Sequence, residues 1–182
     1  MDLLDKSPPD RITVADAARA LGVSSGAPFR HFKDRGVLMA NVAAIGFDRL
    51  KARMSQAYER HPPGSLQRII AGGCAYIEFS AENPNLFKLM WGETRHDGDE
   101  TVARTSGEAS YLNFIDNLHE TMRAEGFGDR DPREFGAPLW TMVHGYADLV
   151  VGANRMLDRD PVAISRQVSA ATFAYFEGQR SS

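Results

Sequence analysis

Apolar residues recur at spacings of three and four positions along almost the whole chain, and no long stretch alternates apolar with polar residues. The first spacing gathers apolar side chains on one face of an α-helix, whereas a half-buried β-strand needs strict alternation. The sequence therefore predicts an all-α protein. With 182 residues, of which 43% are hydrophobic, the chain is long enough to bury a hydrophobic core.

Proline, glycine and polar capping residues divide the chain into separate predicted helices. The expected helices cover residues 13–21, 24–32, 36–60, 65–82, 84–91, 102–124 and 132–157, and a last helix opens at Pro161. The strongest interruption is the run His61-Pro62-Pro63-Gly64. We place a domain boundary there, which separates residues 1–61 from residues 62–182.

The composition excludes several classes of protein. The single cysteine, Cys74, cannot form an intrachain disulfide, and its apolar neighbours indicate a small buried side chain. The sequence has no charged segment followed by an apolar one at its start, and no apolar run near 18 residues. We therefore expect a cytoplasmic protein that is neither exported nor inserted in a membrane.

The charge of the chain is unevenly distributed. Residues 1–60 hold ten Lys and Arg against seven Asp and Glu, although the whole chain has a net charge of −3. A basic N-terminal third on an acidic body is typical of a small DNA-contacting module joined to a ligand-sensing domain.

Residues 12–32 have the pattern of a helix-turn-helix, in which the second helix enters the major groove of DNA. Ala17 and Ala18 are small enough to let two helices approach, and Gly22 permits the turn between them. The short polar run that starts at Ser24 suits contacts with bases and phosphates. A plain helical hairpin is the alternative that this spacing leaves open.

The same segment resembles the N-terminal module of the TetR family of transcriptional regulators, from residue 12 to about residue 50. The resemblance rests on Thr13, Ala17, Ala18, Leu21-Gly22-Val23-Ser24, Phe29, His31-Phe32, Arg35 and Leu38. It implies a dimeric repressor that binds a palindromic operator and is released by a small-molecule effector. By motif position, the DNA-facing residues would be Thr13, Ser24, Ser25, Ala27, Phe29, Arg30, His31 and Arg35.

Within that set, Arg30 has the chemistry to read a guanine edge or a phosphate, and Arg35 at a helix start suits a phosphate contact. The sequence departs from the family pattern at three places. Phe29 stands where the family usually has tyrosine, Gly36 replaces an acidic residue, and only Leu3-Leu4 represents the family's first helix. The alternative function, which follows from the missing first helix, is a helical dimer that binds a ligand or a protein but no longer binds DNA.

The C-terminal part carries a weaker resemblance. The run from Trp140 to His144-Gly145 resembles the Trp and His-Gly pattern of one TetR subgroup. A cavity for a small apolar or amphipathic effector needs apolar walls and a few polar anchors. The candidate effector-binding residues are Phe87, Met90, Trp91, Phe114, Leu118, Met122, Trp140 and His144. Ordinary core packing is the alternative for each of them.

The last two long helices offer small and apolar residues that suit a four-helix interface between two copies of the chain. These residues include Ala147, Val151, Ala171 and Phe173. A twofold dimer would place two DNA-reading segments about one duplex turn apart, roughly 34 Å. Burial of the same residues within one chain is the alternative.

No sequence feature favours an enzyme. A phosphate-binding loop, a dinucleotide fingerprint and a nucleophile elbow are all absent from the sequence. His96, Asp97, Asp99 and Glu100 have metal-binding side chains, but their polar, glycine-containing surroundings favour a solvated turn. We expect no catalytic activity, no cofactor and no bound metal.

Overall fold

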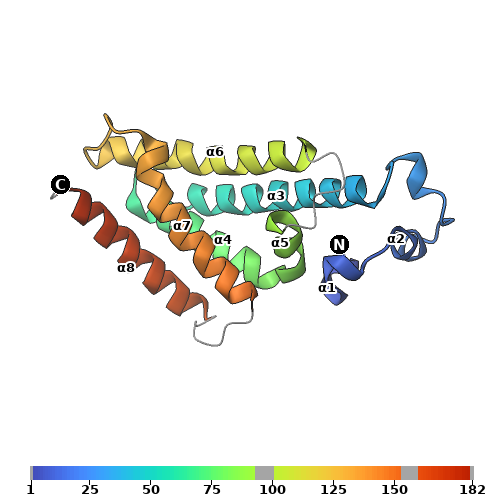
Figure 1. Cartoon of the computed structure of the whole chain (residues 1–182). Helices are drawn as coiled ribbons and strands as arrows, with labels where there is room; N and C mark the ends of the chain where they lie inside the picture. The colour runs from blue at the N-terminus through green and yellow to red at the C-terminus, as the bar shows by residue number, and fades with distance from the viewer. Residues whose placement is uncertain (1, 93–100, 153–159, 181–182) are drawn as a thin grey trace. The chain divides into compact units, whose positions relative to one another are not determined.

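The computed structural model describes residues 2–92, 101–152 and 160–180, and every regular element in these ranges is helical (Figure 1). The α-helices are α1 (Asp2–Lys6), α2 (Val14–Ala20), α3 (Arg35–Glu59), α4 (Leu66–Glu82), α5 (Pro84–Trp91), α6 (Thr101–Ala124), α7 (Pro132–Val151) and α8 (Pro161–Arg180). Two 3-10 helices, η1 (Pro9–Arg11) and η2 (Pro28–Arg30), lie near the N-terminus. The predicted all-α class is confirmed.

Helix starts follow the capping residues in the sequence. Thr13 caps α2, Asp131 caps α7 through the Arg133 N–H at 2.7 Å, and Asp160 accepts the Ala163 N–H at the start of α8. Proline at the first position of α5, α7 and α8 suits a helix start because its missing N–H would be unpaired there. The helix expected over residues 132–157 ends as α7 at Val151, and residues 153–159 lie outside the described ranges.

The contacts divide the chain into two compact units, each described by itself. The first comprises Met1–Arg49 and Asn83–Glu108, and the second Leu50–Glu82 and Ala109–Ser182. This division runs through the long helices α3 and α6, so it does not test the boundary expected after residue 61, which stays a prediction.

The core of the first unit forms where α5 packs on the N-terminal half of α3. Phe47 of α3 is 2% exposed, and its ring meets Trp91 edge-on at a centroid distance of 5.1 Å. Gly46 leaves room for the side chain of Met90, whose Sδ would lie 2.7 Å from a β-carbon at that position. The other side of α5 contacts α1 and η1.

The core of the second unit forms around α4, which packs against both α7 and α8 (Figure 1). Side chains such as Ile77, Leu118, Phe135 and Phe176 are almost completely buried there. Burial of apolar surface at this scale is the main stabilising contribution to such a bundle. No helix within the described ranges is long and apolar enough to cross a membrane.

The turn between α3 and α4 is held by one arginine. Arg68 Nη1 donates to the carbonyl oxygens of Tyr58 and His61, at 3.0 and 3.1 Å, and Arg68 Nε donates to Asn117 of α6 at 2.7 Å. The last carbonyls of a helix lack partners within it and form the negative end of its dipole, so a cation stabilises them.

Candidate functional site

The first half of the predicted helix-turn-helix forms as expected. Thr13 and Asp16 make a capping box at the start of α2, with the Asp16 N–H donating to Thr13 Oγ1 at 3.1 Å and the Thr13 N–H donating to Asp16 at 3.0 Å. The Thr13 hydroxyl and the Thr13 N–H both donate to the Asp16 carboxylate, and these two hydrogen bonds are the main reason that the pKa of Asp16 lies below its usual range. Gly22 then adopts a φ of 66°, which reverses the chain after α2.

The second helix of the motif, expected over residues 24–32, does not form, and this expectation is wrong. Residues 25–27 make a turn, and only η2 (Pro28–Arg30) is helical. Pro28 has no N–H to donate to the Ser24 carbonyl, which accepts the Ala27 N–H at 2.9 Å instead. The shorter i→i+3 pattern continues to His31, so the segment is a tight turn, which we call the reading turn (residues 24–31).

The reading turn is accessible. Ser24, Ser25, Phe29, Arg30 and His31 are exposed, and Ala27 is half-buried. Phe29 leaves 55% of its surface in contact with solvent, which is high for an aromatic side chain. The predicted DNA-facing residues of this turn therefore lie on the surface, and their contacts with DNA stay a prediction.

The other two members of the predicted DNA-facing set have partners within the chain. Thr13 is exposed, but its hydroxyl is 2.6 Å from Asp16 Oδ2. Arg35 is half-buried, and its guanidinium donates to the backbone carbonyls of Ile12 and Pro9. Both side chains stabilise the N-terminal unit, a role that the motif did not indicate.

The eight candidate effector residues fall into two groups. Phe87, Met90 and Trp91 belong to α5 in the first unit, where Phe87 and Met90 are almost completely buried. The remaining five belong to the second unit: Phe114, Leu118, Met122, Trp140 and His144.

In the second unit, Phe114, Leu118 and Met122 are core residues of α6, and Phe114 and Leu118 lie against Gly136 of α7. Leu118 and Met122 are fully buried, and a β-carbon at Gly136 of α7 would lie 2.6 Å from Leu118 Cδ2. Such close packing leaves no space beside Leu118, and both buried side chains contribute to stability in this conformation.

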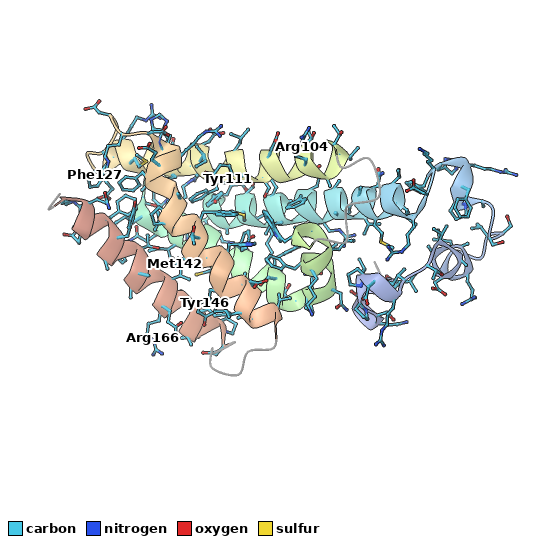
Figure 2. All side chains as sticks on the ribbon, in the orientation of Figure 1. Arg104, Tyr111, Phe127, Met142, Tyr146 and Arg166 are labelled. Carbon is cyan, nitrogen blue, oxygen red and sulfur yellow. The ribbon has the colours of Figure 1, made fainter. Side chains whose placement is uncertain are left out.

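Trp140 and His144 are the half-buried members of the predicted effector set in the second unit. Their rings stack at a centroid distance of 5.0 Å with an interplanar angle of 4°, as the i, i+4 spacing on α7 allows. The Tyr76 hydroxyl lies 2.8 Å from His144 Nδ1, and Tyr111 meets Trp140 edge-on at 6.1 Å. We call Tyr76, Tyr111, Trp140 and His144 the aromatic cluster; Figure 2 shows Tyr111 on α6 beside α7.

The aromatic cluster has the chemistry of a ligand site with a polar anchor. Trp140 and His144 are both half-buried, and desolvation lowers the pKa of His144 more than Asp148 raises it. A neutral imidazole can accept a hydrogen bond at one ring nitrogen and donate from the other. The sequence reasoning missed Tyr76 and Tyr111 because both lie on other helices, and no local spacing connects them to α7.

The structure buries some of the residues expected at a dimer interface and exposes others. Ala147 and Val151 are buried within their own chain, so the expectation that they face a partner is wrong. Their face of α7 is turned inward because α7 packs on α4. Phe173 of α8 is 41% exposed, and Leu149 and Val162 are also exposed apolar residues of α7 and α8.

The candidate metal residues His96, Asp97, Asp99 and Glu100 lie outside the described residues. Cys74 is buried as expected, and burial raises the pKa of its thiol.

Comparison with known proteins finds one matching family model and several similar structures. The tetracyclin repressor-like C-terminal domain matches residues 69–171, which is more than half of the chain. A protein of unknown function from Rhodococcus sp. RHA1 has a similar structure, with a TM-score of 0.80, 30% identity, and coverage of 96% of this chain and 88% of that one. The TetR family transcriptional regulator PfmR from Thermus thermophilus shares the fold, with a TM-score of 0.65, 17% identity, and coverage of 97% and 93%.

One relative is similar to this chain in sequence over most of its length. The nucleoid occlusion factor SlmA of Idiomarina loihiensis is 30% identical over 149 residues, which cover 80% of this chain and 74% of the relative. The subgroup suggested by Trp140 and His144-Gly145 stays a prediction. With its N-terminal capping box, its all-helical body and these matches, the chain belongs to the TetR family of transcriptional regulators.

Proposed function

We propose that this protein is a repressor that binds a palindromic operator as a homodimer through the reading turn and is released by a small effector. The observation that carries the proposal is the exposure of Ser24, Ser25, Arg30 and His31 in one short turn of a TetR-family chain. These side chains offer hydroxyl, guanidinium and imidazole groups, which are the groups that contact phosphates and base edges.

Within the reading turn, we assign base recognition to Arg30. Its side chain is exposed, and a guanidinium can donate two hydrogen bonds to the O6 and N7 atoms of guanine in the major groove. Phe29 cannot donate to a phosphate as a tyrosine would, but its exposed ring suits contact with a sugar or a thymine methyl. Arg11 and Arg19 border a cavity of about 360 Å³ lined by residues of α1, η1 and α2. Arg19 is paired there with Asp16 at 3.1 Å, so the positive charge that this edge adds to the unit comes from Arg11.

For the dimer, we propose an interface on the exposed apolar face of α7 and α8. Val162 and Phe173 lie about three turns apart on one face of α8 and leave 72% and 41% of their surfaces exposed. Leu149, near the end of α7, leaves 45% exposed, and a second copy would cover these apolar side chains. A twofold arrangement would present two reading turns to successive major grooves of one duplex face.

For the effector, we propose a small apolar or amphipathic molecule that contacts Trp140 and His144 of the aromatic cluster. The stacked rings offer apolar surface, and the imidazole offers hydrogen bonding in a partly desolvated setting. Such a ligand releases DNA only if it binds one of two conformations more tightly than the other. The remaining members of the predicted effector set stay predictions.

The experiment is fluorescence anisotropy with labelled duplexes from the region upstream of the protein's own gene. Arg30→Ala should remove the preference for a specific duplex over a scrambled one while the helical content stays unchanged, because Arg30 is exposed. The matched control is Arg49→Ala, an exposed arginine outside the reading turn. Unchanged discrimination in Arg30→Ala would contradict the assignment of the DNA surface.

A second candidate function is a ligand-binding helical dimer without operator binding. One observation favours it, namely that residues 24–32 form a turn and a 3-10 helix where a recognition helix was expected. If the wild-type protein binds the upstream duplex no better than the scrambled one, while a ligand still raises its melting temperature, this candidate replaces the first.

A further inference from the structure

Arg35 makes a forked contact with the backbone near the N-terminus. Its Nε donates to the Ile12 carbonyl oxygen at 2.8 Å, and its Nη2 donates to the Pro9 carbonyl oxygen at 2.5 Å. The two acceptors lie 23 and 26 positions earlier in the chain. The planar guanidinium presents its donors in a rigid fork, so one side chain fixes the first residue of η1 and the residue that precedes the N-cap of α2.

The location of Arg35 explains why it needs these acceptors. It is the first residue of α3, where Asp34 caps the helix by accepting the Val37 N–H at 2.9 Å. The N-terminus of a helix carries partial positive charge, which disfavours a cation in its first turn. The two carbonyl dipoles offset that disadvantage for a half-buried guanidinium.

The same contact joins the two ends of the segment that carries the reading turn. Between Ile12 and Arg35 the chain forms α2 and the reading turn, and these two residues mark the ends of that segment. The hydrogen bond between Arg35 and Ile12 therefore closes the base of this segment. Without the hydrogen bonds of Arg35, the ends of the segment would lose this link and regain conformational entropy.

A second side chain, that of Asn85, binds the backbone of α1, which precedes η1 in the sequence. Asn85 of α5 donates from Nδ2 to the Leu4 carbonyl oxygen of α1 at 2.7 Å, and η1 also contacts α5. Leu4 itself is buried. Side chains from later in the chain thus donate hydrogen bonds to three backbone carbonyls of the N-terminal segment, those of Leu4, Pro9 and Ile12. α2 and the reading turn follow these anchored residues in the sequence.

We propose that Arg35 is a positioning residue, which sets the orientation of α2 and the reading turn by closing their base, and that it is not a phosphate contact. This inference rests on the proposed operator binding. It contradicts the expectation from the motif, in which a basic residue at this helix start binds a phosphate.

The test compares Arg35→Lys and Arg35→Ala by anisotropy with the upstream duplex over a series of KCl concentrations. Lysine keeps the charge for a phosphate but lacks the fork that reaches two carbonyls. We expect both variants to bind about tenfold more weakly, the equivalent of one charge-assisted hydrogen bond, with an unchanged salt dependence. Wild-type affinity in Arg35→Lys, together with a salt slope that falls by about one in Arg35→Ala, would overturn the proposal.

Hydrogen exchange tests the same closure without DNA. In both variants the amides of residues 11–20 should exchange faster, while those of α4, α7 and α8 keep their wild-type rates, which also shows that the protein remains folded. Arg49→Lys, an arginine-to-lysine change at an exposed position of α3, is the matched control and should change neither measurement. Arg30→Ala should weaken binding without changing exchange.

The binding and the exchange measurements separate the role of Arg35 from the proposed operator binding. Absence of wild-type DNA binding would refute operator binding and the role of Arg35 in it, whereas the exchange rates still decide whether Arg35 closes the base. Unchanged exchange of residues 11–20 in both Arg35 variants would overturn the closure itself.

Discussion

Gly72 of α4 is the place where one added methyl group should do most damage to the second unit. A β-carbon there would lie 2.1 Å from Cε1 of Tyr58 and 2.7 Å from its hydroxyl oxygen. Tyr58 is 2% exposed, and the Arg68 guanidinium lies 5.9 Å from its ring centroid, so the ring has little room to move away. Overpacking of this kind costs about 1–3 kcal/mol, whereas alanine gains up to about 1 kcal/mol over glycine in a helix.

Because 2.1 Å is far inside any tolerated contact, we expect a cost near or beyond the upper end of that range and a net loss of about 2 kcal/mol for Gly72→Ala. Thermal unfolding followed by circular dichroism should show a fall in Tm of about 4 to 8 °C for a chain of this length. The control is Gly178→Ala in α8, where a β-carbon would meet no atom within 4 Å and the stability should stay the same or rise slightly.

A double-mutant cycle isolates the cause. In a Tyr58→Leu background, the cost of Gly72→Ala should fall by more than about 0.5 kcal/mol, because the ring that causes the clash is gone. A Gly72→Ala protein as stable as the wild type would refute the reasoning, since it would mean that helix propensity outweighs the contact with Tyr58. Equal costs in both backgrounds would show that the clash lies elsewhere.

Two further predictions concern the dimer and the aromatic cluster. Phe173→Asp should shift the protein toward monomer in sedimentation equilibrium with unchanged helical content, because it puts a charge on the exposed apolar face of α8; an unchanged mass would argue against that interface. Burial lowers the pKa of His144, so its contribution to stability is complete above the unfolded value of 6.5 and is lost as the pH falls through the folded pKa. Urea midpoints between about pH 7 and about pH 5 should therefore fall less in His144→Gln than in the wild type, and parallel curves would contradict this.

Local signals in the sequence predicted most helices well, for a physical reason. Thr13, Asp131 and Pro161 act within one turn of their own positions, so the start of a helix can be read from neighbouring residues. The error at residues 24–32 has the same local origin. The family pattern favoured a helix, but Pro28 removes the N–H that would bond to Ser24, and that single missing donor shortens the helix to η2.

The candidate sites were less predictable because they depend on contacts between helices. The spacing of Trp140 and His144 indicated one face of α7, but Tyr76 is 68 positions from His144 and has no sequence signal that points to it. The small size of Ala147 likewise could not tell whether its face of α7 meets α4 or a second chain. Periodicity identifies an apolar face, and only packing decides what covers it.

Arg35 and Arg68, both half-buried, show why charge alone is a poor guide to function in this chain. Both donate to two backbone carbonyls, yet Arg68 sits beside a helix C-terminus, where its charge is favoured, and Arg35 sits at an N-terminus, where it is not. A cation at the positive end of a helix dipole needs a compensating interaction, and a phosphate would provide that interaction only while DNA is bound. The carbonyls of Pro9 and Ile12 supply it in the free protein, so the orientation of the reading turn would be set before DNA arrives. Operator affinity would then depend on preorganisation at Arg35 and on recognition at Arg30, two contributions that the salt dependence of binding can separate.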